Sequence, residues 1–423
     1  MRPETLLSLL IGGALGAGGI LQGLQWKAAA ELSNQEENEI RIRELESELD
    51  MLRSENDSLR SLAEGGGEIE VPTELLHFAE DAFGIEFRSS PVVHRIAYEE
   101  LSGRVIASIE SRFPPNTLDH RQMAWRLMGL LAPDDLFAPQ LAATYSLGAR
   151  SWFDDQTGEA WVTDQFEPTS VPDQGALLRV IVRILLHQHF PQRPGYAGDE
   201  ADRARTALHH GAALAVENRF LARQALGTGF TGSQNRTNDA TDLLASLPAY
   251  IRGLATFASR VGLPRSERLM ERDEFLPVLH NPPATTAAIF DPVPPSPASP
   301  DFAEPEVPVV LEESAGRLGL ELWLATLEPE DPSWVAPAAD WLGDRYRLTA
   351  RSDLLIDLDW QIELATSESA DRIAEAALLM AGVLAEKETD PTLDEWSISP
   401  DGRRLRVTKP APTRVRFEHL AKP

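Results

Sequence analysis

The sequence contains no cysteine. This absence excludes disulfides, thiolate-bound zinc and cysteine nucleophiles, and it fits an exported protein without proving export. Positive charge is also scarce, with 39 Lys and Arg against 66 Asp and Glu and a formal net charge of -27. Nucleic acid is therefore not expected as a partner, because binding a phosphate backbone requires a basic face.

The fingerprints of several enzyme classes are missing as well. The 423 residues contain no G-x-S-x-G elbow, no P-loop and no Gly-rich dinucleotide motif. The chain is nevertheless long enough for two or three domains with a sizeable core. Other patterns must therefore indicate the function.

One long apolar run is present, close to the N-terminus. Residues 5–24 carry no charge and are long enough to cross a bilayer as a helix. Arg2 precedes the run, so the positive-inside rule predicts a transmembrane signal anchor over residues 1–27 with a cytoplasmic N-terminus. The bulk of the chain is then periplasmic or otherwise extracytoplasmic. A signal peptide cleaved near residues 28–30 is the alternative.

Two features predict a parallel homodimer that is attached to the lipid bilayer. Gly12 and Gly16 have the G-x-x-x-G spacing that lets membrane helices approach closely, and residues 31–64 have coiled-coil periodicity. The residues at the a and d positions are Ile42, Leu45, Leu49, Leu52, Asn56 and Leu59. The flanking charge pairs attract in a parallel dimer, and an a-position Asn fixes register. A lone solvated helix is the alternative, and residues 65–70 contain the three glycines of a flexible hinge.

A buried helix is predicted in the middle of the chain. Apolar residues surround most of a helix that begins at Leu177 and ends in the sequence His-Gln-His-Phe at residues 187–190. A second helix is expected over Ala207–Phe220. The rest of the globular region is organised around these two helices.

The pair resembles the helices of bacterial and archaeal zincin-like metallopeptidases of the gluzincin type. In that family the first helix carries H-E-x-x-H and ends in Q-H-F, and the second carries E-G-D-A. The Q-H-F end matches residues 188–190, which places Arg179, Val180 and Arg183 at the His, Glu and His positions. On the second helix, His210 stands at the position of the third zinc ligand, the Glu of E-G-D-A.

These replacements remove the chemistry of the motif. Two imidazoles one turn apart bind Zn²⁺, and the Glu between them activates water. Arg179 and Arg183 stay protonated and offer no lone pair, and Val180 accepts no proton. The resemblance therefore implies that zinc has been lost and that the domain has no catalytic residues. Buried arginines need carboxylate partners, and we expect these on the second helix or in the C-terminal region, with Glu217 the nearest by spacing.

A histidine group keeps one alternative open. The group consists of His187, His189, His209 and His210, and one from each pair, such as His189 with His210, could approach to form a metal site. A divergent metal-dependent hydrolase that uses these residues is the alternative function. Remnants that cap helices or bond to the backbone are the simpler interpretation.

The resemblance continues over residues 71–390. Upstream, residues 149–162 predict a hairpin of the family's G-x-Y-D-P-x-T-G-x-L-Y-V form, in which Asp154 and Gly158 match. Further amphipathic helices are expected over Leu75–Phe83, Val92–Arg112 and Met123–Leu131. Downstream, the family's remaining blocks are similar to Leu247–Phe257, Asn281–Pro292, Gly316–Leu324 and Trp341–Tyr346. A strand over Leu354–Leu364, a helix over Ser369–Glu386 and a short strand over Arg404–Val407 are also predicted.

The predicted fold is α+β. A mainly helical zincin-like domain with a small β-hairpin or sheet covers residues 71–290, and a Pro-rich acidic linker covers 291–310. A smaller α/β region with a polar tail covers 311–423. The predicted protein is a membrane-anchored cell-envelope protein with an inactive peptidase-like domain, which binds an unknown protein or peptide partner or acts as a scaffold.

Overall fold

The structure, a computed structural model, describes residues 67–191, 198–228, 244–291, 300–304, 306–327, 331–352, 355–386 and 392–422. The predicted membrane anchor and coiled coil lie outside these residues. Residues 68–423 form one compact unit. Within the described part of the chain, no helix is long and apolar enough to span a membrane.

The described residues form a mixed fold of helices and sheets, as the predicted α+β class requires. The first part of the unit contains α2 (Thr73–Phe83), β1 (His94–Ile96), α3 (Tyr98–Ser111), α4 (Thr117–Leu127), α5 (Phe137–Ser146), β2 (Ser151–Phe153), β3 (Ala160–Thr163), α6 (Val171–His189) and α7 (Asp199–Thr228). It continues with α9 (Ala249–Phe257), the π-helix η2 (Ala258–Gly262), α10 (Leu263–Glu271), α11 (Phe275–His280) and α12 (Ala287–Phe290). The last part contains β4 (Val309–Glu313), α13 (Gly316–Leu327), the 3-10 helix η3 (Pro332–Asp340), β5 (Trp341–Ser352), β6 (Leu355–Leu364), α14 (Ser367–Leu384), β7 (Ser397–Ile398), β8 (Arg404–Ala411) and β9 (Arg414–Leu420).

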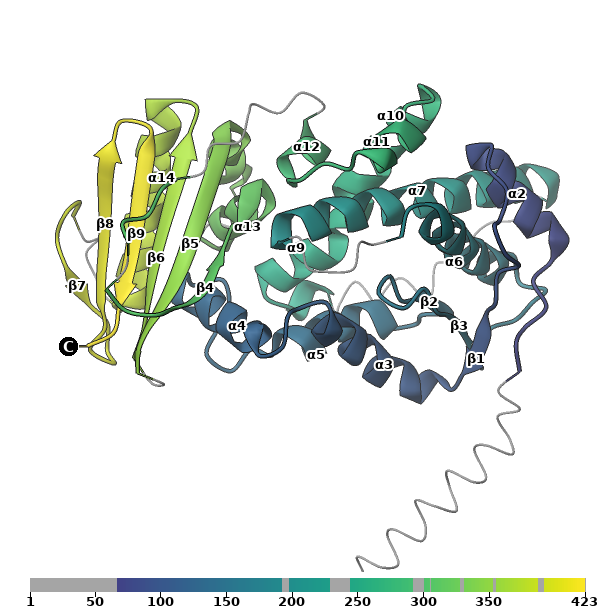
Figure 1. Cartoon of the computed structure of the whole chain (residues 1–423), viewed down its shortest axis with the longest axis horizontal. Helices are drawn as coiled ribbons and strands as arrows, with labels where there is room; N and C mark the ends of the chain where they lie inside the picture. The colour runs from purple at the N-terminus through teal and green to yellow at the C-terminus, as the bar shows by residue number, and fades with distance from the viewer. Residues whose placement is uncertain are drawn as a thin grey trace, which may run out of the picture. The chain divides into compact units, whose positions relative to one another are not determined.

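Helix α6 is the centre of the helical part, as its sequence predicts. It is buried on almost every side, since twelve of its nineteen residues are buried. Pro172 lies in its first turn, where a missing N–H costs nothing, and the helix ends before Pro191. The predicted second helix is longer than expected and is α7, which packs along α6 (Figure 1).

A small three-stranded sheet packs beside α6. β2 and β3 form the predicted antiparallel hairpin, and β1 adds to β3 in parallel, in the order β1-β3-β2. The prediction of one helix over Val92–Arg112 was wrong at its start. Ala97 has an extended backbone, so the chain enters α3 only at Tyr98, after His94 has paired with Trp161.

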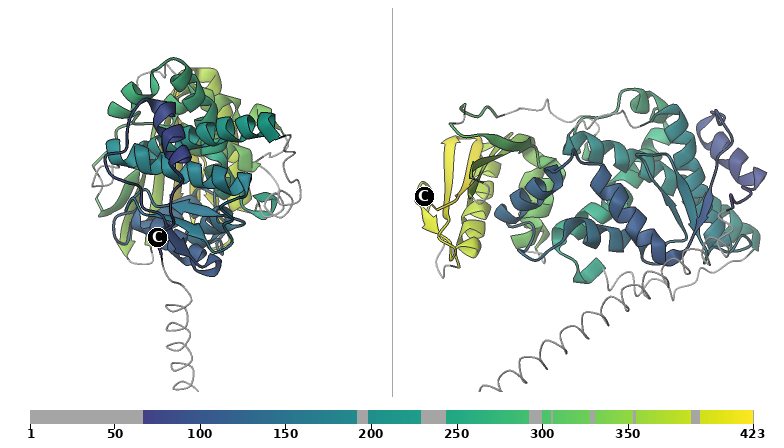
Figure 2. Two further views of the ribbon diagram at one scale, coloured as in Figure 1. Left: turned by 90° about the vertical axis from the view of Figure 1, so that its right-hand side faces the viewer. Right: turned by 60° about the horizontal axis from the view of Figure 1, so that its bottom comes forward.

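A six-stranded antiparallel sheet forms the other end of the unit, as the right-hand view in Figure 2 also shows. Its order is β4-β5-β6-β9-β8-β7, with α13 and α14 packed against one face (Figure 1). The predicted strand over Leu354–Leu364 and helix over Ser369–Glu386 correspond to β6 and α14. The expected polar tail is instead β9, which lies between β6 and β8 in the middle of the sheet.

Candidate functional site

Helices α6 and α7 and the β2–β3 hairpin enclose a cavity of about 400 Å³, which we call the outer cavity. The residues at the three H-E-x-x-H positions and at the position of the third zinc ligand line it, together with the expected partner on α7. These residues are Arg179, Val180, Arg183, His210 and Glu217. Residues far apart in the sequence are therefore brought to one concave surface. Aromatic side chains of the hairpin and α5, including Trp152, Phe153 and Tyr145, form much of the remaining wall.

Arg183 lines this cavity and is buried. It forms an ion pair with Asp155, which also accepts a hydrogen bond from Arg112 at 3.3 Å. The Arg183 guanidinium lies over the Phe153 ring, 5.1 Å from its centroid. Burial alone would raise the pKa of Asp155, but the two arginines lower it to about 2, so the carboxylate is charged at neutral pH.

Arg179 is less buried and pairs with the predicted residue. Its Nη1 lies 3.4 Å from Glu217 Oε2, and 30% of its side chain is exposed. The expected Glu217 partner is thus confirmed for Arg179 and wrong for Arg183, whose partner Asp155 comes from the hairpin. Burial raises the pKa of Glu217 while Arg179 opposes this rise.

The hairpin turn that supplies Asp155 is built by its neighbours. The side chain of Asp154 accepts a hydrogen bond from the Gln156 backbone N–H at 2.8 Å, and Gly158 has a φ of +75°. A side chain at position 158 would also collide with His187, since its Cβ would lie 2.8 Å from His187 Nε2. Glycine at this position therefore lets the turn pack directly against the end of α6.

The four histidines do not gather as a ligand set. His189 Nε2 lies 2.8 Å from the Glu86 carbonyl, and His187 packs edge-on against Phe153 with ring centroids 5.7 Å apart. Burial lowers the pKa of His187, lowers that of His209 to about 4, and lowers that of His210 well below its usual value. These rings are neutral at neutral pH. Within the described ranges, no group of three or more His, Asp or Glu residues is arranged to hold a metal ion.

A second, smaller cavity of about 90 Å³ lies between α3, α5, α7 and α9, and we call it the inner cavity. Tyr145 and His210 line both cavities, so the two spaces meet at these side chains. The other lining residues are Ile109, Arg112, Phe113, Phe137, Leu141, Asp199, Asp202, Arg203, Thr206, Ala207, Leu254, Ala255, Phe257, Ala258 and Leu318. A charged end and an apolar wall are thus combined in one small space.

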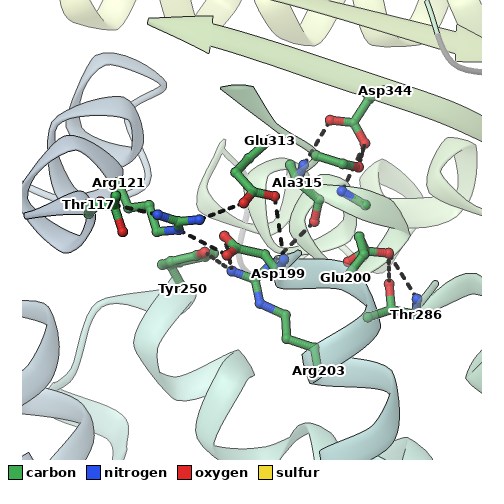
Figure 3. Close-up of polar contacts among 12 residues, drawn as sticks. Thr117, Arg121, Asp199, Glu200, Arg203, Tyr250, Thr286, Glu313, Ala315 and Asp344 are labelled. Atoms are coloured by element: carbon green, nitrogen blue, oxygen red, sulfur yellow. Dashed lines mark hydrogen bonds and ion pairs between the residues drawn. The ribbon is translucent and has the colours of Figure 1, made fainter. Parts of the chain in front are cut away.

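A buried ionic network holds the start of α7 against the neighbouring elements (Figure 3). Arg121 of α4 donates to Asp199 Oδ1 at 2.9 Å and to Glu313 of β4 at 2.5 Å. Arg203 lies 3.5 Å from Asp199 Oδ2 and donates to the Tyr250 hydroxyl of α9 at 3.0 Å. These contacts join the helical part to the six-stranded sheet and fix the side of α7 that lines the inner cavity.

Glu200 makes a second connection in the same region (Figure 3). Its Oε2 accepts from the Thr286 N–H at 2.9 Å and from the Thr286 hydroxyl at 2.8 Å. Gly316 leaves room for it, since a Cβ at 316 would lie 1.8 Å from Glu200 Cδ. Burial raises the pKa of Glu200 to about 8, against the opposing effects of Arg203 and Thr286. This carboxyl group is therefore mostly protonated at neutral pH.

Sequence reasoning placed the motif positions and Glu217 at the site but missed Arg112, Asp155 and the inner cavity. Asp155 adjoins a residue that the hairpin motif singled out, which was the one available signal for it. Arg112 appeared only as the last residue of a helix. Comparison with known proteins adds no assignment, because no family model, no curated protein and no solved structure matches this chain.

Proposed function

We propose that residues 68–423 form a zincin-like binding domain that holds a peptide or protein segment in the outer cavity without cleaving it. The observation that carries this proposal is the lining of the cavity. Arg179, Val180 and Arg183 line it, in the positions that resemble the peptidase motif. The residues at these positions line a concave space, and Arg179, Val180 and Arg183 offer neither a zinc ligand nor a general base.

The chemistry of these side chains supports binding rather than catalysis. Both guanidinium groups are in ion pairs, Arg179 with Glu217 and Arg183 with Asp155, so their charge is used to satisfy buried carboxylates. They do not fit Zn²⁺, because a guanidinium offers no lone pair and repels a dication. Without a metal or a general base at position 180, no water is activated at this place.

The remaining parts of the proposal follow from the N-terminal sequence. A transmembrane helix over residues 1–27 attaches the protein to the envelope membrane, and the coiled coil over 31–64 pairs two copies in parallel. Two binding domains on one stalk then engage a repeated or dimeric partner more strongly than either alone.

The first experiment measures zinc content and proteolysis of the purified full-length chain. We expect less than stoichiometric zinc by mass spectrometry, no cleavage of casein, and a melting temperature that does not change with chelator. Stoichiometric zinc or chelator-sensitive cleavage would overturn the proposal in favour of a divergent hydrolase that uses the histidines.

The second experiment measures binding of fluorescein-labelled chymotryptic casein peptides by anisotropy. Leu147 and Leu136 flank helix α5 and are both exposed, but only Leu147 lines the outer cavity. Leu147→Trp should weaken peptide binding by obstructing the cavity, whereas Leu136→Trp should leave it unchanged. Equal effects of the two variants, or no binding by the unmodified chain, would rule out the outer cavity as the binding site.

A further inference from the structure

The charged groups that line the inner cavity are Arg112, Asp199, Asp202 and Arg203. Three of them are in ion pairs, since Arg112 pairs with Asp155 and Arg203 pairs with Asp199. Asp202 forms no ion pair with any described residue, although Arg112 and Arg203 both act on its charge from a longer distance and Asp202 is the largest charge acting on Arg112. The inner cavity therefore contains one carboxylate without a bonded counter-ion.

We propose that the inner cavity binds the side-chain ammonium group of a lysine residue, with Asp202 as its counter-ion. This inference rests on the proposed function, because the lysine belongs to a peptide that lies in the outer cavity. Its side chain enters where Tyr145 and His210 separate the two spaces. The inner cavity then selects which peptides the domain holds.

The size of the cavity suits this side chain. Because one water position needs about 10–15 Å³ of cavity volume, a cavity of about 90 Å³ has room for about six to nine such positions. The lysine side chain has four methylenes and one nitrogen. Its methylenes fit the apolar walls formed by Phe113, Phe137 and Phe257.

The polar end of the cavity suits an ammonium group. Thr206 lines the cavity one helical turn after Asp202, and its Oγ1 is buried without a hydrogen-bond partner among the described residues, so it is an available acceptor. Burial raises the pKa of Asp202, and a cation placed next to it would offset this cost. His210 adds no repulsion at the entrance, because burial keeps its ring neutral.

An anionic ligand suits the cavity less well. Both guanidinium groups that line it, those of Arg112 and Arg203, already hold carboxylates of the protein. At longer range the formal charge of -27 attracts cationic segments and repels anionic ones. Local pairing and overall charge therefore favour the same class of ligand.

The test uses the full-length chain and labelled blocked pentapeptides, Ala-Ala-X-Ala-Ala, in which X is lysine, norleucine or glutamate. Norleucine keeps the apolar chain of lysine and lacks its charge. We expect the lysine peptide to bind at least about tenfold more tightly than the norleucine peptide, as a partly buried charge pair requires. Asp202→Asn should remove this difference, whereas Asp81→Asn, the same change at an exposed site on α2, should leave it intact.

The outcomes separate the inference from the proposed function. If the lysine and norleucine peptides bind equally, or the glutamate peptide binds best, the lysine site is wrong while peptide binding stands. A small probe, n-butylamine, tests the cavity without any peptide. If it raises the melting temperature of the unmodified chain and not that of Asp202→Asn, while no pentapeptide binds, the cation site stands and the peptide function fails. If neither probe binds, both proposals are overturned.

Discussion

Replacing Arg183 by alanine should destabilise the folded protein more than any exposed substitution. The variant removes the ion pair with Asp155 and the contact of the guanidinium with the Phe153 ring. Asp155 stays buried and keeps only the longer contact with Arg112, at 3.3 Å. A buried carboxylate that loses its main partner is costly, because neither water nor another cation replaces it.

The size of the effect follows from the ionisation of Asp155. Its pKa falls from 3.8 to about 2 on folding, and at about 1.4 kcal/mol per pH unit this corresponds to about 2.5 kcal/mol. Arg183 is the largest of the favourable contributions, and the lost ring contact adds to it. We therefore expect Arg183→Ala to lower the free energy of unfolding by about 3 kcal/mol at pH 7.

The loss should also depend on pH. A carboxyl group with a lowered folded pKa stabilises the protein above its unfolded pKa, and this contribution disappears as pH falls toward the folded value. For Asp155 the window runs from about 4 down to about 2, so the gap between Arg183→Ala and the unmodified chain should narrow as pH falls below 4.

Urea unfolding at pH 7 and at lower pH measures both quantities. Arg95→Ala, an exposed arginine on β1, is the matched control and should change stability by less than about 0.5 kcal/mol. The double variant Arg183→Ala with Asp155→Ala should recover part of the loss, because it leaves no unpaired charge. A loss below about 1 kcal/mol, or a double variant no better than the single one, would refute the assigned ion pair.

Three further predictions test other parts of the chain. Gly211→Ala should cost at least about 2 kcal/mol, because its Cβ would lie 2.3 Å from the carbonyl carbon of Gly262, a backbone atom that cannot give way. Gly103→Ala is its control in urea unfolding, because the added Cβ would have no atom within 4 Å, and this variant should be neutral or stabilising. Glu200→Gln should gain stability relative to the unmodified chain as pH rises from 5 to 8, by at least about 1 kcal/mol. The reason is that the folded pKa of Glu200 is about 8, so the unmodified protein loses stability as pH rises through this range, whereas a neutral amide causes no such loss. Plots of unfolding free energy against pH that run parallel for the two proteins would contradict this prediction. The full-length chain should sediment as a dimer at micromolar concentration. Asn56→Leu should stabilise the stalk and allow oligomers other than the dimer to form. If the unmodified chain sediments as a monomer, the predicted coiled coil is wrong.

The central helices were predictable because their pattern is long and unambiguous. Apolar residues on every side of α6 leave burial in a helical core as the consistent interpretation, and the Gln-His-Phe end before Pro191 fixes its end. Short elements were less predictable. Val93 and Ile96 lie at helical spacing with the residues of α3, so β1 could not be separated from the helix that follows it.

The last strand shows a different limit. Val415 and Phe417 alternate with arginines as a half-buried strand requires, so a pattern for β9 was present. Pro410 and Pro412, just before it, favoured an irregular tail instead. His419 is buried on the same side as Val415 and Phe417, but it is a polar residue and so breaks the apolar–polar alternation of the sequence. Its place between β6 and β8 depends on pairing with strands that no local pattern specifies.

Of the ion-pair partners of Arg179 and Arg183, one was predictable from the sequence and the other was not. Glu217 could be named because it is the nearest acidic residue by spacing on the expected second helix, and Arg179 does pair with it. Asp155 could not be assigned to Arg183, since that contact depends on how the hairpin folds back over the end of α6. Long-range contacts of this kind follow from topology, which a single sequence determines only weakly.

The polar residues on one face of α7 have a spacing that stability alone does not explain. Asp199, Asp202, Thr206 and His210 follow one another at intervals of three and four residues, so they form a stripe along one face of the helix. Replacing buried ionic groups with well-packed apolar residues is often neutral or stabilising, so a purely structural helix would gain by losing this stripe. A stripe in which Asp202 makes no ion pair with any described residue, next to an entrance lined by His210, is better explained by a ligand that completes it.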